Sequence, residues 1–331
     1  MVPATGVDCG ANVVMDQRSI LIGAAIYTLL QFAFIAALNP ATIAHFHTWA
    51  NLAKDNALDA GPFYTVAKVA GLAWLAWILR VDAVVSPGGT GLIYLTSATR
   101  LSYGLSKNGY VPEVFEKTSE RTKIPVIGVI ISAVVGLLFL LPFPSWSSLI
   151  YIVTGASVLM YAGAPLALGA LRKTKPNLAR SYRLPLAGVI APLSFVLANF
   201  IVYWAGWNTV SLLMAVLHVG YALMALSGAL HLNTHMPQID WGAAIWIFPY
   251  MIGMTIISYF GNFGAGGLFG VGGIFKNFWV GGQGDINIWI SLLILAAFSL
   301  FIYYLAIYSR LPESKVDEYI KDVYPAPAPS H

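Results

Sequence analysis

The stretch INIWISLLILAAFSLFIYYLAIY, residues 286–308, contains no charged side chain. A helix of this length extends about 34 Å, which exceeds the thickness of about 30 Å of a bilayer's hydrocarbon layer. Seven further apolar runs reach or approach the same length. We therefore expect an all-α integral membrane protein with about eight transmembrane helices. The predicted helices are Ser19–Leu38, Phe63–Ser102, Pro125–Leu141, Ser148–Leu171, Leu186–Trp204, Val210–Leu230, Gly242–Phe260 and Ile286–Tyr308.

The composition excludes a soluble globular protein. Of the 331 residues, 58% are hydrophobic and 10% are charged, whereas soluble domains carry about 25% charged residues. The net charge is +4, and in a membrane protein an excess of lysine and arginine reflects the positive-inside rule. We therefore expect the lipid bilayer as partner and no nucleic acid. Cys9 is the only cysteine, which excludes an intrachain disulfide, and no Cys/His cluster predicts a metal site or another cofactor.

The distribution of basic residues predicts the orientation of the helices. Most of the 18 lysines and arginines lie before the first helix, after the second, after the fourth and after the eighth, which is one side of the membrane if the helices alternate. Both termini should then be cytoplasmic in a multi-pass protein of the cell (plasma) membrane. The N-terminus lacks the pattern of a cleaved signal peptide.

The predicted helices divide the chain into four parts. We expect a cytoplasmic N-terminal segment, a group of six helices, two additional helices joined by the glycine-rich external loop Gly261–Gly284, and a cytoplasmic disordered tail. Before the second helix, helical spacing in the stretch 40–62 predicts a short external helix. The expected boundaries of the four parts are 1–18, 19–230, 231–308 and 309–331.

The second apolar run, Phe63–Ser102, is the least regular segment. It is too long for one crossing, and it contains Arg80, Asp82 and the sequence Ser-Pro-Gly-Gly at Ser86–Gly89. Proline lacks an N–H and glycine is conformationally free. We expect the helix to tilt and to break locally at Ser86–Gly89.

Asp82, Ser86 and Thr90 are the candidate binding residues. An ionised carboxylate in hydrocarbon costs several kcal/mol unless it is paired or hydrated, so a membrane-embedded aspartate predicts a functional site. The spacing of four residues places the three oxygen-bearing side chains on one stripe of the helix. The stripe predicts a site for a coupling cation or proton, Na⁺ or H⁺.

A structural interpretation of the same residues remains open. Asp82 can pair with Arg80 or with a polar group of another helix, and the glycines at positions 88, 89 and 91 can permit close helix packing. No serine-hydrolase, zinc-protease, phosphate-loop or dinucleotide motif occurs in a suitable context. We therefore expect no enzymatic activity and no catalytic residues.

Two segments resemble a known family. The string SATRLSYGLSKNGYVPEVF, Ser97–Phe115, is similar to the segment that follows the eighth helix of amino acid/polyamine/organocation (APC) superfamily permeases. The string LRKTKPNLARSYRLP, Leu171–Pro185, is similar to that family's loop between the tenth and eleventh helices. Two apolar helices separate the strings, as they do in the family. The matching positions are Arg100, Tyr103, Gly109 and Pro112 in the first string and Arg172, Pro176, Arg180, Tyr182, Arg183 and Pro185 in the second.

The resemblance implies a partial leucine-transporter-like fold with a site near the bilayer midplane. It makes this chain equivalent to the family's C-terminal portion, helices 7–12, with two extra helices. It further implies secondary transport of amino acids or related organic cations. The chain would then be either a truncated gene product or one component of a split transporter in which a separate chain supplies the first six helices, and this chain alone would be inactive. In such permeases the eighth helix contributes oxygen ligands to a coupling-cation site, which would assign Asp82, Ser86 and Thr90 to that role. The alternative is a non-transporting membrane scaffold or assembly subunit.

Overall fold

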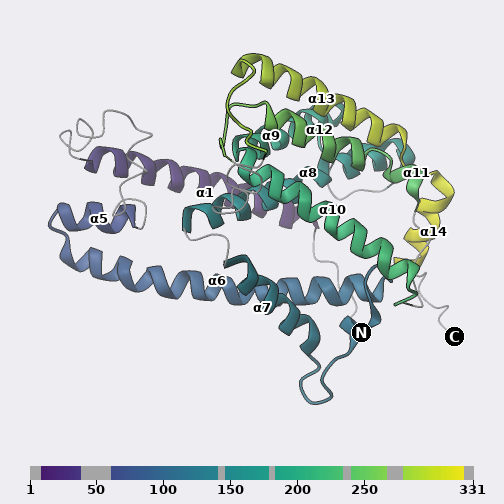
Figure 1. Cartoon of the computed structure of the whole chain (residues 1–331), viewed down its shortest axis with the longest axis horizontal. Helices are drawn as coiled ribbons and strands as arrows, with labels where there is room; N and C mark the ends of the chain where they lie inside the picture. The colour runs from purple at the N-terminus through teal and green to yellow at the C-terminus, as the bar shows by residue number, and fades with distance from the viewer. Residues whose placement is uncertain are drawn as a thin grey trace. The chain divides into compact units, whose positions relative to one another are not determined.

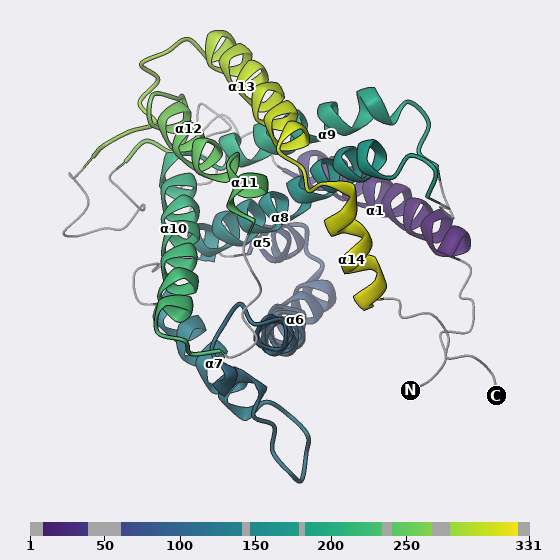
Figure 2. The ribbon, with the colours of Figure 1, turned by 90° about the vertical axis from the view of Figure 1, so that its right-hand side faces the viewer.

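Helices are the regular elements of this protein. The computed structural model describes residues 9–38, 61–140, 146–178, 183–233, 240–266 and 279–323, and within these ranges the β-structure is one isolated antiparallel bridge, Gly266 to Gly281. Figures 1 and 2 show the helices in two views. In chain order they are α1 Cys9–Ala37, α5 Pro62–Val69, α6 Ala73–Lys107, the 3-10 helix η1 Glu113–Glu116, α7 Val126–Leu140, α8 Trp146–Thr174, α9 Ala187–Trp204, α10 Trp207–Ala229, α11 Trp241–Ala244, α12 Ile247–Tyr259, α13 Ile288–Tyr308 and α14 Glu313–Val323.

By length and composition, six helical segments in the described ranges can cross a membrane. The apolar part of α7, Val126–Leu138, is shorter, and α6 with its charged residues is not among the six. The expectation of an all-α membrane protein is confirmed, with six spans meeting this criterion rather than eight. The six segments are Arg18–Ala37, Ile152–Thr174, Ala187–Trp204, Trp207–Ala229, Trp241–Tyr259 and Ile288–Tyr308.

The break in the second predicted helix lies elsewhere than expected. Instead of breaking at Ser86–Gly89, α6 continues through Pro87, and the interruption falls at Ala70–Leu72 between α5 and α6. Gly71 has φ +74°, its N–H bonds to the Lys68 carbonyl, and the Leu72 N–H bonds to the Ala67 carbonyl. These are the two bonds of a Schellman cap, which requires a left-handed residue that glycine supplies without strain. A proline removes only one helical bond, so a long helix can continue past it.

Chain contacts divide the protein into two compact units, residues 1–98 with 179–183 and residues 99–178 with 184–331. In the first unit, α1 and α5 meet through the rings of Phe34 and Phe63, whose centroids are 5.5 Å apart. The second unit contains the main buried core, built from α8, α9, α10, α12 and α13. Its centre includes Phe195, Met251 and Ile302, all essentially inaccessible to solvent.

Glycines let the helices of the second unit approach closely. A Cβ at Gly253 of α12 would collide with the ring of Phe298 on α13, and one at Gly169 of α8 would collide with Tyr303 of α13. Such small-residue contacts are how membrane helices pack without a hydrophobic driving force between them.

A buried polar triad joins three helices in the same core. Tyr250 Oη of α12 donates to Asn199 Oδ1 of α9 at 2.8 Å, and Asn199 Nδ2 donates to Ser299 Oγ of α13 at 3.0 Å. Ser299 Oγ also donates to the Leu295 carbonyl at 2.7 Å. The amide oxygen and nitrogen of Asn199 therefore both have partners, as a buried amide requires. The triad fixes the rotation of α9, α12 and α13 about their axes.

The substitution Tyr250→Phe should destabilise this bundle. It leaves the Asn199 Oδ1 acceptor buried without its donor, which costs about 1–3 kcal/mol in soluble proteins and about 0.6 kcal/mol on average in membrane bundles. Thermal unfolding of the purified chain in detergent should show a lower midpoint for Tyr250→Phe. The control Tyr308→Phe removes a hydroxyl from a side chain that is 85% exposed, and an equal shift in both variants would contradict the argument.

The helix α14 follows α13 (Figure 2) and forms ion pairs with residues distant in sequence. Lys175, just after α8, contacts Glu313 at 2.6 Å and Asp317 at 2.7 Å, and Lys315 contacts Asp240, just before α11, at 2.6 Å. The hydrogen bonds that Lys175 Nζ donates to Asp317 and Glu313 raise the pKa of Lys175, and the hydrogen bond that Asp240 accepts from Lys315 lowers the pKa of Asp240. The helix occupies part of the segment 309–331, so the expectation of a wholly disordered tail there is wrong for Glu313–Val323.

Two earlier expectations concern residues outside the described ranges. The predicted external helix at 40–62 lies outside them except for its last two residues, and so does the middle of the glycine-rich loop, 267–278. The described ends of that loop are joined by the bridge between Gly266 and Gly281, with N···O distances of 3.2 and 3.0 Å.

The ion pairs of α14 should respond to charge removal and to acid. Lys175→Gln should speed amide hydrogen exchange in α14 by about 2- to 5-fold, the range expected for exposed pairs. The pKa of Asp240 is lowered in the folded chain. The stability that its ion pair with Lys315 contributes is therefore present above the ordinary aspartate pKa of about 3.9, and it is lost as the pH falls from that value through the lowered pKa. Lys173→Gln is the control, since Lys173 is exposed and forms none of the described ion pairs. Unchanged exchange in Lys175→Gln would show that the pairs do not hold the helix.

Candidate functional site

The three predicted site residues lie on the uninterrupted helix α6. Asp82, Ser86 and Thr90 fall within an arc of about 80° and span about 12 Å along the axis, as the α-helix geometry requires for residues four apart. All three side chains are exposed. The structure therefore brings them to one stripe of one helix, which we call the α6 oxygen stripe.

Pro87 adds a backbone oxygen to this stripe. Because proline has no N–H, the Ala83 carbonyl lacks the donor that an ordinary residue at position 87 would supply. Ala83 lies about 100° around the helix from Asp82, next to the arc of the stripe. One carboxylate, two hydroxyls and one carbonyl are oxygen groups of the kind that bind hard cations, and a carboxylate can also carry a proton. The helix supplies this carbonyl without unwinding.

The structural alternatives for these residues find no support among the described residues. Asp82 forms no ion pair with any residue in the described ranges, and Arg80 lies about 200° away around the helix. A Cβ placed at Gly88, Gly89 or Gly91 would meet no atom within 4 Å. In the described chain the glycines therefore contact no neighbouring helix.

A buried asparagine, which our reading of the sequence missed, anchors the C-terminal end of α6. Asn233, 5% exposed and just after α10, donates from Nδ2 to the Ser106 carbonyl at 2.9 Å and to the Val111 carbonyl at 2.8 Å. The Glu113 N–H bonds to the Leu232 carbonyl at 3.2 Å in the same place. The only sequence signal was an asparagine following the apolar run of α10, which is equally typical of an ordinary helix end. We call these contacts the α6–α10 clasp.

The clasp explains two residues of the first family-like string. Gly109 has φ +82°, and the bonds from Gly109 N–H to the Ser106 carbonyl and from Tyr110 N–H to the Leu105 carbonyl form a Schellman cap at the end of α6. The Pro112 carbonyl accepts a hydrogen bond from Ser106 Oγ at 2.8 Å. The string therefore ends the helix and folds the chain back toward α10.

The second string joins α8 to α9. Arg172 Nη2 donates to the Leu184 carbonyl at 2.9 Å, and Lys175 holds α14 through its ion pairs. The positions Arg180 and Tyr182 lie outside the described ranges. Arg172 and Lys175 of this string thus have structural partners at one end of the bundle.

Comparison with known proteins decides the family. A family model described as "Amino acid permease" matches residues 18–225, which include α6 and the oxygen stripe. The chain belongs to the amino acid permease family. No solved structure gives a significant match.

The matched relatives are transporters. The chain is 34% identical over 304 residues to the aspartate-proton symporter of Bacillus subtilis (strain 168), covering 90% of this chain and 54% of the symporter. It is 33% identical over 250 residues to the glutamate/serine transporter of the same organism, covering 76% of this chain and 45% of that protein. A branched-chain amino acid permease of the organism is 27% identical over 51% of this chain and 36% of its own length. The chain thus spans about half the length of the first two relatives.

These matches confirm the resemblance and the expectation that this permease is not an enzyme. The alignment with the symporter covers more residues than the family model does. It therefore extends into the two additional helices after residue 230. None of the comparisons tests the assignment of Asp82, Ser86 and Thr90, which stays a prediction.

The α6–α10 clasp should depend on Asn233. Asn233→Ala removes the donor that the structure gives to the part-buried Val111 carbonyl, and losing the hydrogen bond costs up to about 1–3 kcal/mol, the range for a fully buried acceptor. Hydrogen exchange of the chain in lipid nanodiscs should become faster across residues 108–117. Asn108→Ala changes an exposed asparagine in the same loop and should leave exchange unchanged. Similar exchange in the two variants would mean that Asn233 does not hold the clasp.

Proposed function

We propose that this chain forms the C-terminal portion of a secondary amino acid transporter of the cell membrane, with both termini in the cytoplasm. The observation that carries the proposal is the permease match across α6, the helix on which Asp82, Ser86 and Thr90 form one exposed stripe. Two relatives that align with most of this chain are named for aspartate, glutamate and serine. An acidic amino acid is therefore the first solute to test.

We propose that a proton at Asp82 drives transport. A relative that is 34% identical to this chain is an aspartate-proton symporter, and protonation would remove the cost of a carboxylate charge in a low-dielectric site. A protonated Asp82 would favour a closed, solute-bound conformation, and an ionised Asp82 would favour a state open to water. The proton then acts by its different affinity for the two conformations. Ser86, Thr90 and the Ala83 carbonyl would accept or donate hydrogen bonds around the carboxyl group.

We further propose that a second chain supplies the helices that cover the α6 oxygen stripe. The stripe is exposed, and the glycines beside it have open space around them in the described chain. A carboxylate facing lipid is costly, whereas one facing another helix or a water-filled path is satisfied. This chain alone would then be inactive.

Uptake by proteoliposomes tests the proposal. The vesicles contain this chain alone, or this chain co-expressed with the product of the adjacent upstream DNA, and receive radiolabelled aspartate under an inward proton gradient. Accumulation should require both chains. Accumulation by this chain alone would disprove the two-chain part of the proposal. No uptake in either preparation, with folded protein in both, would favour the alternative of a non-transporting scaffold or assembly subunit.

Asp82→Asn should uncouple transport from the proton gradient. An asparagine keeps the size of the side chain but cannot bind and release a proton, so the gradient-driven part of uptake should fall by at least roughly 10-fold. Exchange of labelled for unlabelled aspartate without a gradient should fall less. The control Asp285→Asn changes an exposed carboxylate in the loop before α13. Gradient-driven uptake that survives Asp82→Asn would exclude Asp82 as the proton site.

A further inference from the structure

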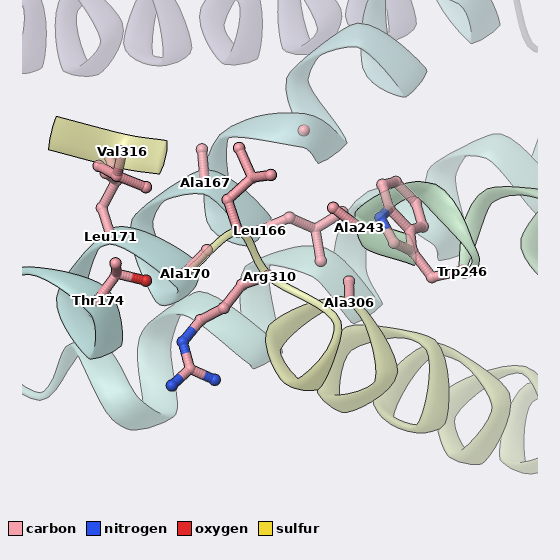
Figure 3. A pocket seen from close by; sticks show the side chains of 12 residues that line it. Leu166, Ala167, Ala170, Leu171, Thr174, Ala243, Trp246, Ala306, Arg310 and Val316 are labelled. Atoms are coloured by element: carbon pink, nitrogen blue, oxygen red, sulfur yellow. The ribbon is translucent and has the colours of Figure 1, made fainter. Parts of the chain in front are cut away.

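An apolar pocket lies at the end of the second unit where α14 docks. It has a volume of about 370 Å³, and its walls come from α8, α11, α13 and α14 and from the residues just after α11 and α13. Figure 3 shows Trp246 at one end of the pocket and Leu171, Thr174 and Val316 at the other. A second apolar cavity of about 190 Å³ adjoins it, since both are lined by Gly163, Leu166 and Trp246.

Small side chains create the space. Gly163, Ala167 and Ala170 lie on one face of α8 because they are spaced by four and three residues. Ala243 and Ala306 line the pocket from α11 and α13. Water is unfavourable in this apolar space because a buried water molecule needs polar hydrogen-bond partners. An empty space is also unfavourable because the side chains around it lose dispersion contacts. In a bilayer, the acyl chain of a neighbouring lipid is the apolar group at hand.

One positively charged side chain lines the pocket. Among the residues that line it, Arg310 is the only charged one, and its Nη1 donates to the Ile307 carbonyl at 2.9 Å. None of the ion pairs in the described chain includes Arg310, whereas the nearby Lys175 and Lys315 are paired with carboxylates. The guanidinium fork matches the geometry of a phosphate group. The charge at this pocket thus favours an anionic headgroup over a zwitterionic one.

The position of Arg310 also fits the depth of a headgroup. Arg310 follows the C-terminal end of α13, and Thr174 is the last residue of α8, so both lie where spanning helices reach the membrane–water boundary. The side chain of Arg310 extends away from Trp246 (Figure 3). The positive-inside expectation makes this the cytoplasmic leaflet, which carries the anionic lipids.

We propose that this pocket binds an anionic phospholipid of the adjacent leaflet. Its phosphate lies at Arg310 and Thr174, and one acyl chain enters between α8 and α13 beneath Leu311 and Val316 and reaches Trp246. The proposal concerns a lipid site in the second unit and does not depend on transport or on the α6 oxygen stripe.

Quenching of tryptophan fluorescence tests the site. The full chain is reconstituted in phosphatidylcholine vesicles that contain increasing fractions of phosphatidylglycerol with brominated acyl chains, because bromine quenches only tryptophans that it contacts. We expect a saturable component at low fractions of brominated phosphatidylglycerol and none with brominated phosphatidylcholine at the same fractions. Trp246→Phe should remove that component and leave the non-saturable quenching by bulk lipid.

Two pairs of variants separate the pocket from its charge. At both Gly163 and Gly188 an added Cβ meets no atom within 4 Å, so both sites have room for a side chain. Gly163→Leu should abolish the saturable component because it fills the pocket, whereas Gly188→Leu, which lies outside the pocket lining, should leave it unchanged. Arg310→Gln should raise the half-saturating lipid fraction by roughly 10-fold through loss of the charge-assisted bonds. Lys173→Gln, an exposed cation at the same end of α8, should leave it unchanged.

Three results would overturn the proposal. They are the absence of a saturable component in the unmodified chain, its persistence in Gly163→Leu, and equal saturation by the two brominated lipids. Circular dichroism and the thermal midpoint of each variant confirm that it is folded, so that a lost component reports on the site.

Discussion

A backbone N–H or C=O inside hydrocarbon has no water to bond to, and this constraint governs how the chain turns as well as how it spans. The helices α5 and α6 end at the positive-φ glycines Gly71 and Gly109, where the amides of each glycine and of the residue after it bond back to the last turn. The loop between α12 and α13 also bonds to a helix end, since the Gly282 N–H donates to the Tyr259 carbonyl at 2.7 Å. With its ends satisfied, each helix can be positioned by side chains alone. The Ala83 carbonyl is an exception that Pro87 imposes within a helix.

Polar side chains follow the same rule in one part of the protein and depart from it in another. In the second unit Asn199, Ser299 and Tyr250 satisfy one another in the core, and Asn233 satisfies carbonyls of the α6–α10 clasp. On α6 the carboxylate of Asp82 is exposed and has no ion-pair partner among the described residues. Polar side chains that hydrogen-bond to one another within the core hold the helices in place. A polar side chain on the exposed surface of a membrane helix instead needs a partner from another molecule. This contrast is the physical reason for assigning function to α6 rather than to the buried triad.

Length and apolarity predicted most of the helices because the bilayer imposes both directly. Helices α7, α8, α9 and α13 begin and end within three residues of their predicted bounds. The break in the second run was misplaced because a missing N–H at Pro87 is a stronger signal in the sequence than the cap at Gly71. The helix α14 was missed because its support comes from Lys175 and Asp240, which are distant in sequence. The stripe followed from helical spacing, but no local pattern could reveal that Asn233 reaches Ser106.

The helix α8 experiences two different environments along its length. Gly169 receives Tyr303 of α13, and Gly155 faces Thr209 and Leu213 of α10, so these positions are tightly packed. Gly163 has no atom within 4 Å of its would-be Cβ and opens instead into the pocket beneath α14. Close-packed contacts resist displacement, whereas an unfilled face permits it. Whatever fills the pocket therefore determines how firmly α8 is held between α13 and α14, so that a lipid there would stiffen the bundle without touching the α6 oxygen stripe.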